Sequence, residues 1–303
     1  MNESNNFSLK KRAKTFYFAS LFFPKGIRTD IETLYLFCRY VDDIGDTFNL
    51  KKKFTEDKLK RIIVDINKLN SNEPIISKFI LLVKKHKINK KIPIKLVEGI
   101  LDDLGKVYFN TESELIKYSY KVAGTVGVMV CNIFKVKEKD LKFKGIQLGI
   151  AMQITNIARD IEEDLLRNRI YFPEELRSLK IKRTNKIIKN ENYKRTISND
   201  LEKLLTLADD IYDNSWSGIN KLPITYRIPI AIASYLYQSI GFKIRKDNYN
   251  IWNKRHHLNL IQKIIKSLQV LVKLIFHNRD KTNTELEKRI HSILNRMGNF
   301  YCE

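Results

Sequence analysis

Residues 153–164 read Gln153-Ile-Thr-Asn-Ile-Ala-Arg-Asp-Ile-Glu-Glu-Asp164. Asn156, Asp160 and Asp164 are spaced four apart, so on a helix all three side chains project from one face. Met152, Ile154, Ile157 and Ile161 surround them, which embeds the acids among apolar residues of the helix. Because like charges at this spacing repel each other, the acidic face requires a positive partner, and we expect it to bind a cation.

A second acidic face occurs nearer the N-terminus, in Tyr35-Leu-Phe-Cys-Arg-Tyr-Val-Asp-Asp-Ile-Gly-Asp46. Asp42 and Asp46 are one helical turn apart, with their Cβ atoms about 5–6 Å from each other. Carboxylates among apolar residues are costly unless they are paired or bind a cation. Oxygen ligands without His or Cys favour Mg²⁺ or Mn²⁺, and Mg²⁺ commonly adds substrate phosphates to one or two carboxylates. The two faces therefore predict a diphosphate held by metal ions.

A simpler explanation is that these acids form a solvated surface that balances the many lysines. That explanation accounts for one acidic string better than for two. Each string also carries an arginine close to an aspartate, Arg39 in the first and Arg159 in the second. We therefore favour the binding site.

The composition favours a bundle of helices. The chain has 303 residues, is 43% hydrophobic, and contains only 11 Gly and 6 Pro, so long segments are free of helix breakers. Apolar residues recur mostly at three- and four-residue steps. We predict an all-α, single-domain bundle over residues 1–303. Its expected helices span about 9–24 and 141–166, one carries 118–129 behind a capping box at Thr111 and Glu114, and another begins at Pro173.

The net charge of +22 allows three interpretations: nucleic-acid binding, attraction to an anionic membrane, or a solvated lysine-rich surface. No nucleic-acid-binding motif accompanies it, so we expect no nucleic-acid partner. Cys38, Cys131 and Cys302 show no CxxC spacing, which fits a reducing compartment. The N-terminus lacks a signal-peptide pattern. We expect a cytoplasmic protein, with peripheral contact at the inner face of the membrane as an open alternative.

Five segments together resemble the squalene/phytoene synthase family, and they extend over most of the chain. The segments are Lys14–Pro24, Leu36–Asp46, Tyr118–Met129 (YSYKVAGTVGVM), Leu148–Pro173 and Tyr237–Tyr249. One position departs from the family pattern, because Asn168 stands where a glycine usually precedes Arg169. Asn tolerates a left-handed backbone, so we expect the turn to be kept. Gly124 and Gly127 predict a kink or a close helix approach rather than a nucleotide loop.

The resemblance implies the isoprenoid-synthase helical bundle, with a central active-site cavity. It implies the head-to-head condensation of two prenyl diphosphates through a cyclopropylcarbinyl diphosphate. The residues expected to bind Mg²⁺ or Mn²⁺ are Asp42, Asp46, Asn156, Asp160 and Asp164, with Asp43 and Glu163 less firmly assigned. The residues expected to act in catalysis are Asp42, Asp46, Asp160, Asp164 and Tyr171. Those expected to bind substrate are Lys14, Thr15, Phe16, Tyr35, Arg39, Gln153, Arg159, Arg169 and Tyr237.

Several of these assignments have a purely structural alternative. Arg39 and Arg159 could form salt bridges within their own helices, and the tyrosines could be buried residues bonded to backbone. Lys14 could be exposed and Thr15 a helix cap. An aromatic wall for the prenyl tails, built from Phe16, Phe18, Phe22 and Phe23, could equally be ordinary packing.

The resemblance is closest to bacterial phytoene synthases. We therefore expect two geranylgeranyl diphosphates to give 15-cis-phytoene without NADPH, and the small Ser20 would leave room for the longer tail. Squalene, hydroxysqualene or dehydrosqualene synthesis from farnesyl diphosphate is the alternative. A non-catalytic relative of the fold, or a basic helical nucleic-acid binder, would leave the full set of acids unexplained. The oligomeric state is left open.

Overall fold

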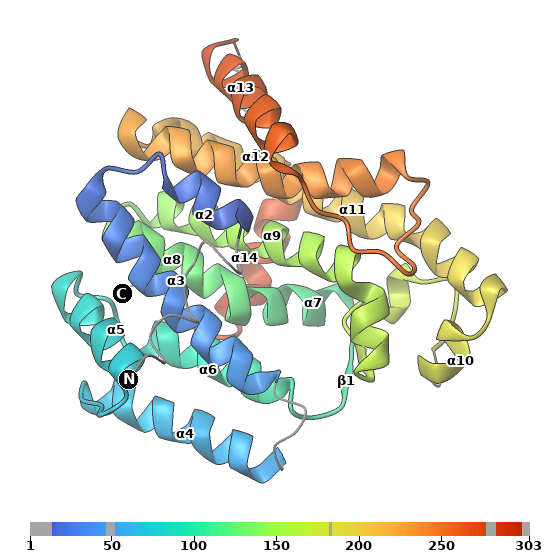
Figure 1. Cartoon of the computed structure of the whole chain (residues 1–303), viewed down its shortest axis with the longest axis horizontal. Coiled ribbons are helices and arrows are strands. Elements are labelled where there is room, and N and C mark those ends of the chain that lie inside the picture. The colour runs from blue at the N-terminus through green and yellow to red at the C-terminus, as the bar shows by residue number, and fades with distance from the viewer. Residues whose placement is uncertain (1–13, 47–51, 182–183, 277–282, 299–303) are drawn as a thin grey trace.

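The computed structural model describes residues 14–46, 52–181, 184–276 and 283–298, and nearly all of its regular structure is helical (Figure 1). The first half of the chain forms α2 (Lys14–Ser20), α3 (Lys25–Gly45), α4 (Lys52–Lys68), α5 (Pro74–Lys85), α6 (Lys91–Asp102), α7 (Glu112–Ser119) and α8 (Thr125–Ile133). The second half forms α9 (Lys139–Leu166), α10 (Thr184–Ile188), α11 (Glu191–Lys221), α12 (Ile224–Lys246), α13 (Leu260–Phe276) and α14 (Thr284–Asn295). The prediction of an all-helical fold is confirmed.

Helix α9 occupies the middle of the bundle, where α8, α11 and α12 pack around it (Figure 1). Its buried residues lie on several sides of the helix, as expected for a helix surrounded by others rather than one lying on a surface. The predicted helix over 141–166 is confirmed and begins two residues earlier. Because α9 is held from several directions, the polar side chains that it carries have a rigid support.

Small residues let α8 and α9 approach closely. A Cβ atom on Gly127 would lie 2.1 Å from the backbone oxygen of Gly145. One on Gly149 would lie 2.4 Å from that of Ala123, in the residues directly before α8. The predicted close approach is confirmed. The capping box of Thr111 and Glu114 is also present. However, the expected helix over 118–129 is interrupted by a π-helical turn, Tyr120–Gly124, which separates α7 from α8.

Two short strands tie the end of α9 to the segment after α6. Strand β1 (Val107–Tyr108) pairs in parallel with β2 (Arg169–Ile170). Just before β2, Asn168 has φ 56, the left-handed conformation expected at this position. Two-residue strands show no periodicity, so the sequence could not predict them. The pairing fixes the backbone that carries Arg169 and Tyr171.

Two predicted helices differ from those observed. Pro173 precedes only a 3₁₀ turn, Glu174–Leu176, and the next long helix is α11, which Asn190 caps by accepting from two backbone N–H groups. The expected first helix ends at Ser20 rather than at Pro24, and its residues 9–13 lie outside the described part of the chain. Among the described helices, none is both long and apolar enough to cross a bilayer.

Candidate active site

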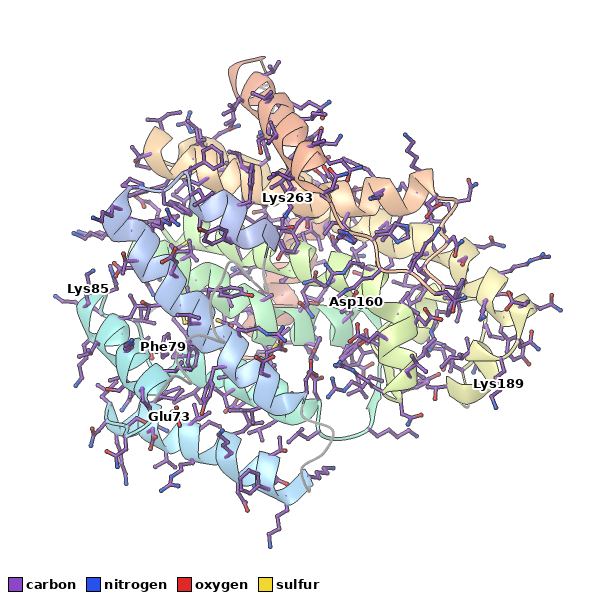
Figure 2. All side chains as sticks on the ribbon, viewed as in Figure 1. Glu73, Phe79, Lys85, Asp160, Lys189 and Lys263 are labelled. Carbon is purple, nitrogen blue, oxygen red and sulfur yellow. The ribbon has the colours of Figure 1, made fainter. Side chains whose placement is uncertain are left out.

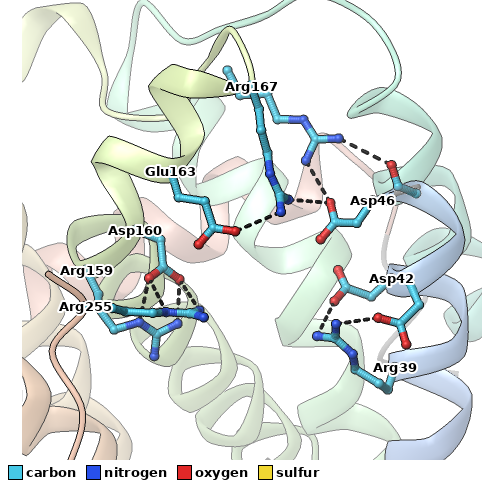
Figure 3. A network of polar contacts seen from close by, with 11 residues as sticks. Arg39, Asp42, Asp46, Arg159, Asp160, Glu163, Arg167 and Arg255 are labelled. Carbon is cyan, nitrogen blue, oxygen red and sulfur yellow. Dashed lines mark hydrogen bonds and ion pairs between the residues drawn. The ribbon is translucent and has the colours of Figure 1, made fainter. Parts of the chain in front are cut away.

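The two acidic faces border one cavity of about 720 Å³. Asp42 lies on the last turn of α3 and Asp46 directly follows that helix, while α9 contributes Asn156, Asp160 and Asp164. Figure 3 shows Asp42 and Asp46 on one side of the gap and Asp160 on the other. Residues more than 100 positions apart in the sequence thus meet around the same space.

Most of the other predicted site residues line the same cavity. These are Thr15, Tyr35, Arg39, Gln153, Arg159, Arg169, Tyr171 and Tyr237. The side chains of Lys14 and Phe16 lie outside what the structure describes. The structure thus places these positions together, while their roles stay predictions.

The proposed aromatic wall is not found for the three phenylalanines that can be checked. Phe18 lies edge-on to Phe22 with ring centroids 5.7 Å apart, and Phe23 packs against Phe134. Phe22 is exposed, and none of the three is among the residues that line the cavity. Ordinary packing therefore accounts for them. Ser20 is also outside the lining, since it is buried and donates to the backbone oxygen of Tyr17 at 2.8 Å.

Of the three predicted arginines, Arg169 pairs with Asp46 at 3.1 Å, and the other two are paired with aspartates of their own helices. Arg39 donates to Asp42 at 3.0 Å and also to Asp43. Arg159 donates twice to Asp160, from Nε at 2.8 Å and from a terminal nitrogen at 2.5 Å. These are the salt bridges that the sequence left as an alternative. They also keep each guanidinium at the edge of the cavity.

Two arginines outside the predicted set also pair with acids of the site. Arg167 contacts Asp46 at 2.7 Å and Glu163 at 2.8 Å. Arg255, in the segment between α12 and α13, makes two bonds of 2.9 Å to Asp160 (Figure 3). Since Arg255 is 95 residues from Asp160, no local pattern could connect them.

A buried carboxylate, Asp103, accepts hydrogen bonds from two tyrosines of the cavity. Tyr118 donates to one of its oxygens at 2.8 Å and Tyr171 to the other at 2.7 Å, and the two rings stack 4.7 Å apart. Burial raises the pKa of the Asp103 carboxyl to about 6, although both tyrosines and Arg169 counteract it. Burial also raises the pKa of both tyrosines, so each stays a neutral donor. We predicted Tyr171 but missed Asp103 and Tyr118, although Tyr118 opens the motif over 118–129.

The charges of the acids are unevenly compensated. Burial and the neighbouring Asp46 raise the pKa of Asp42 to about 6, against the effect of Arg39. Burial and Asp160 raise the pKa of Asp164 well above its usual value. Burial also opposes ionisation of Asp160, but Arg159 and Arg255 together hold its pKa below the usual value. The positive charge near Asp42 and Asp164 therefore does not offset their burial and the repulsion from neighbouring acids.

The donor atoms suit a hard divalent cation. In the described ranges no three acidic, His or Cys side chains lie close enough to hold a metal ion unaided. Mg²⁺ needs only one or two carboxylates when water and phosphate oxygens complete its shell. Asn156 Oδ1 is buried and, among the described residues, has no hydrogen-bond partner. That orphaned oxygen and the under-compensated acids Asp42 and Asp164 fit Mg²⁺ or Mn²⁺.

An apolar wall lies beside the charged groups. It is formed by Cys38, Leu96, Ile100, Val122 and Ile157. Burial raises the pKa of the Cys38 thiol to about 12, so this group stays protonated and behaves as a small apolar side chain. One cavity thus offers carboxylates, guanidinium groups and an apolar surface, which suits an amphiphile with an anionic head.

Comparison with known sequences agrees with this arrangement. The family model described as squalene/phytoene synthase matches residues 9–262. A phytoene synthase from Thermus thermophilus is 30% identical over 256 residues, covering 82% of this chain and 85% of that protein. One from Cereibacter sphaeroides is 29% identical over 262 residues, covering 83% of this chain and 74% of that protein.

Comparison with solved structures supports the same fold. A dehydrosqualene synthase has a TM-score of 0.76 and 24% identity, covering 88% of this chain and 94% of its own. A squalene synthase from Alicyclobacillus acidocaldarius has a TM-score of 0.66 and 22% identity, covering 80% and 91%. With the match of the family model over most of its length, the chain therefore belongs to the squalene/phytoene synthase family of prenyltransferases.

Proposed function

We propose that this protein joins two geranylgeranyl diphosphates head to head to give phytoene. The meeting of two acidic helix faces, five arginines and an apolar wall around one cavity carries the proposal. Relatives named phytoene synthase, among them those of Thermus thermophilus and Cereibacter sphaeroides, support the longer substrate. The overall conversion releases two diphosphates and two protons, so it needs no reductant.

The charged half of the cavity would hold the diphosphate groups. Asp42, Asp46, Asn156, Asp160 and Asp164 would hold Mg²⁺, which when bound would neutralise the charge of the departing diphosphate. Guanidinium groups bind phosphate oxygens through parallel N–H donors, and Arg39, Arg159 and Arg255 all line the cavity. The Nε atom of Arg39 is buried and, in the described residues, has no partner of its own. That free donor supports anion binding.

The apolar half of the cavity would hold the prenyl tails and keep water from the carbocation. In the first step C1 of one substrate bonds to the double bond of the other, one diphosphate leaves, and a proton is lost to form the cyclopropylcarbinyl diphosphate. In the second step the remaining diphosphate leaves, and rearrangement with loss of a proton gives the product. Tyr118 and Tyr171 border the cavity as neutral rings, held in place by Asp103, and aromatic faces can stabilise a nearby cation.

Product analysis tests the proposal. The purified chain is incubated with Mg²⁺ and either the C15 or the C20 diphosphate, with and without NADPH, and the products are identified by mass spectrometry. We expect phytoene from the C20 substrate without NADPH. Asp160→Asn should lower turnover by roughly 100-fold or more, whereas the exposed Asp57→Asn on α4 should not change it. Turnover of only the C15 substrate would contradict the phytoene proposal.

A further inference from the structure

Helix α13 turns its apolar side away from the protein. Of the fifteen large apolar side chains that are exposed in the described residues, six lie on this helix of 17 residues. Their exposed fractions range from 46 to 69%. We call them the outward face: Leu260, Ile261, Ile264, Ile265, Leu268 and Val272. Their spacing of one, three or four residues places them on one continuous side of the helix.

The lysines of α13 lie on the opposite side. Lys263 is buried, while the ammonium groups of Lys266 and Lys273 lie 5.5 Å above the ring of Tyr235 and 4.4 Å above that of Trp216. Figure 1 shows α13 projecting from the bundle beyond α12, and Figure 2 shows Lys263 at its base. A helix on a water-soluble protein normally turns its apolar side inward. The reversed orientation of α13 indicates that another apolar phase covers the outward face.

The charge around α13 favours an anionic partner. Residues 248–276 contain no Asp or Glu, but they include Lys254, Arg255, Lys263, Lys266 and Lys273. The three lysines of α13 face the protein, whereas Lys254 and Arg255, just before the helix, are 41 and 61% exposed while they pair with Asp247 and Asp160. Two copies of the chain that met through this helix would bring two such basic segments together, which is unfavourable. An exposed apolar helix face with exposed cations at its start suits the interface of an anionic bilayer.

The outward face also begins beside the cavity. Arg255, Leu258 and Lys263 line the cavity, and Leu260 and Ile261 follow immediately as exposed apolar residues. We propose that the outward face of α13 docks on the surface of an anionic lipid bilayer and holds the mouth of the cavity against it. A helix of this length spans about 25 Å, and its apolar side would enter roughly 5–10 Å into the lipid. The docking does not depend on which product the enzyme makes.

Co-sedimentation with lipid vesicles tests the docking. The full chain is mixed with vesicles of phosphatidylglycerol and phosphatidylcholine, or of phosphatidylcholine alone. We expect binding to the anionic vesicles that weakens as salt shortens the range of electrostatic attraction. Ile264→Gln, Leu268→Gln and Val272→Gln, introduced together, should lower the partition coefficient on the order of 100-fold. All three side chains are exposed, so the core is not altered.

A matched control uses three equally exposed apolar residues on α4 and α5, at the opposite end of the molecule (Figure 1). These are Phe54, Val64 and Leu81, with 56, 45 and 63% exposure. Their joint replacement by Gln should leave vesicle binding unchanged. Equal loss in both triple variants, equal binding to neutral vesicles, or no binding at all would overturn the proposal.

Two further measurements separate this proposal from its competitors. Sedimentation velocity without lipid would reveal a dimer. If the α13 triple variant dissociated that dimer, the outward face would be a contact between copies, and lipid docking would be overturned. Prenyl coupling with detergent-dispersed substrate should be the same in the α13 variant and the unaltered protein. Loss of coupling in both would contradict the proposed function while leaving the vesicle result valid.

Discussion

Asn156 has a buried amide oxygen, Oδ1, for which the described residues supply no hydrogen-bond donor. An unsatisfied buried acceptor lowers the free energy of unfolding by about 1–3 kcal/mol. Natural proteins tolerate such destabilisation at functional sites, as expected here if the oxygen binds a metal ion. Asn156→Leu, which removes the acceptor, should therefore raise the free energy of unfolding of the metal-free protein by about 1 kcal/mol. It should also abolish prenyl coupling. Urea unfolding without metal, together with the coupling assay, measures both effects.

Asn156→Asp serves as the control, because it keeps an oxygen at the same place but adds a charge near Asp160. It should be less stable than the unaltered protein without metal and should regain stability and part of the activity when Mg²⁺ is added. If Asn156→Leu kept full activity, the oxygen would have no part in metal binding.

Asp103 makes stability depend on pH. Burial raises the pKa of its carboxyl to about 6 in the folded chain, against about 3.9 in an unfolded one. The folded state therefore takes up the proton first, so this group adds stability below pH 4 and loses that contribution as the pH rises through 6. Relative to Asp103→Asn, the unaltered protein should gain about 1 kcal/mol of unfolding free energy between pH 7.5 and pH 5.

The comparison with Asp103→Asn is needed because Asp42 also has a pKa of about 6. Asp42 titrates in both proteins, so its own titration cancels in the difference, except for its electrostatic interaction with Asp103. That interaction affects the Asp103 pKa less than burial, Arg169 or either tyrosine does. Urea unfolding at several pH values gives the two curves. Parallel curves would mean that Asp103 stays ionised throughout this range.

The site residues that the sequence could predict are those defined by spacing along one helix. Asp42, Asp160 and Asn156 were found because helical geometry alone puts each of them on a shared face with its neighbours. Asp103 and Arg255 were missed because their partners are distant in the chain. Such a contact depends on how α6 and the segment before α13 pack, and local periodicity contains no information about that.

The contact between α9 and the π-helical turn before α8 sets the position of the acidic face of α9. A Cβ atom on Gly149 would lie 2.4 Å from the backbone oxygen of Ala123, and neither backbone can move without shifting a helix. Gly149→Ala should therefore lower the free energy of unfolding by about 1–3 kcal/mol. Because Asn156 follows two turns later on α9, turnover should also fall. Urea unfolding and coupling rates measure the two effects.

Gly26 provides the matched helical control. A Cβ atom there would meet nothing within 4 Å, so Gly26→Ala on α3 should stabilise the protein by about 0.5 kcal/mol through helix propensity. If both alanine variants were equally stable, the close approach of α9 to the π-helical turn would not restrict their packing.

The long helices could be predicted from apolar periodicity, and the capping box at Thr111 marked the start of α7. The π-helical turn at Tyr120–Gly124 could not be predicted, because one extra residue in a helical turn leaves the apolar pattern nearly unchanged. Pro173 was misread because proline begins helices and turns alike. Only tertiary contacts decide between these outcomes.

Across the whole molecule, a net charge of +22 coexists with a cavity in which acids and bases alternate. Without substrate, Arg39, Arg159, Arg167 and Arg255 are bound to the same carboxylates that would hold metal. A metal ion alone would have to displace an arginine from Asp42, Asp46 or Asp160. A diphosphate alone would meet the negative carboxylates. Binding of both lets the arginines exchange carboxylate for phosphate while the aspartates turn to the metal.

Mg²⁺ and inorganic pyrophosphate should therefore stabilise the protein cooperatively. Each alone should raise the thermal midpoint only slightly, and together they should raise it by more than the sum, because each improves the binding of the other. A coupling of 1–3 kcal/mol, typical of linked sites, would correspond to roughly 5–150-fold tighter binding of each ligand in the presence of the other. Thermal unfolding over a matrix of the two concentrations measures this coupling. In Arg39→Ala, pyrophosphate should raise the thermal midpoint less than in the unaltered protein, even with Mg²⁺ present. If the shifts of the thermal midpoint in the unaltered protein were simply additive, the arginines and aspartates would not exchange partners.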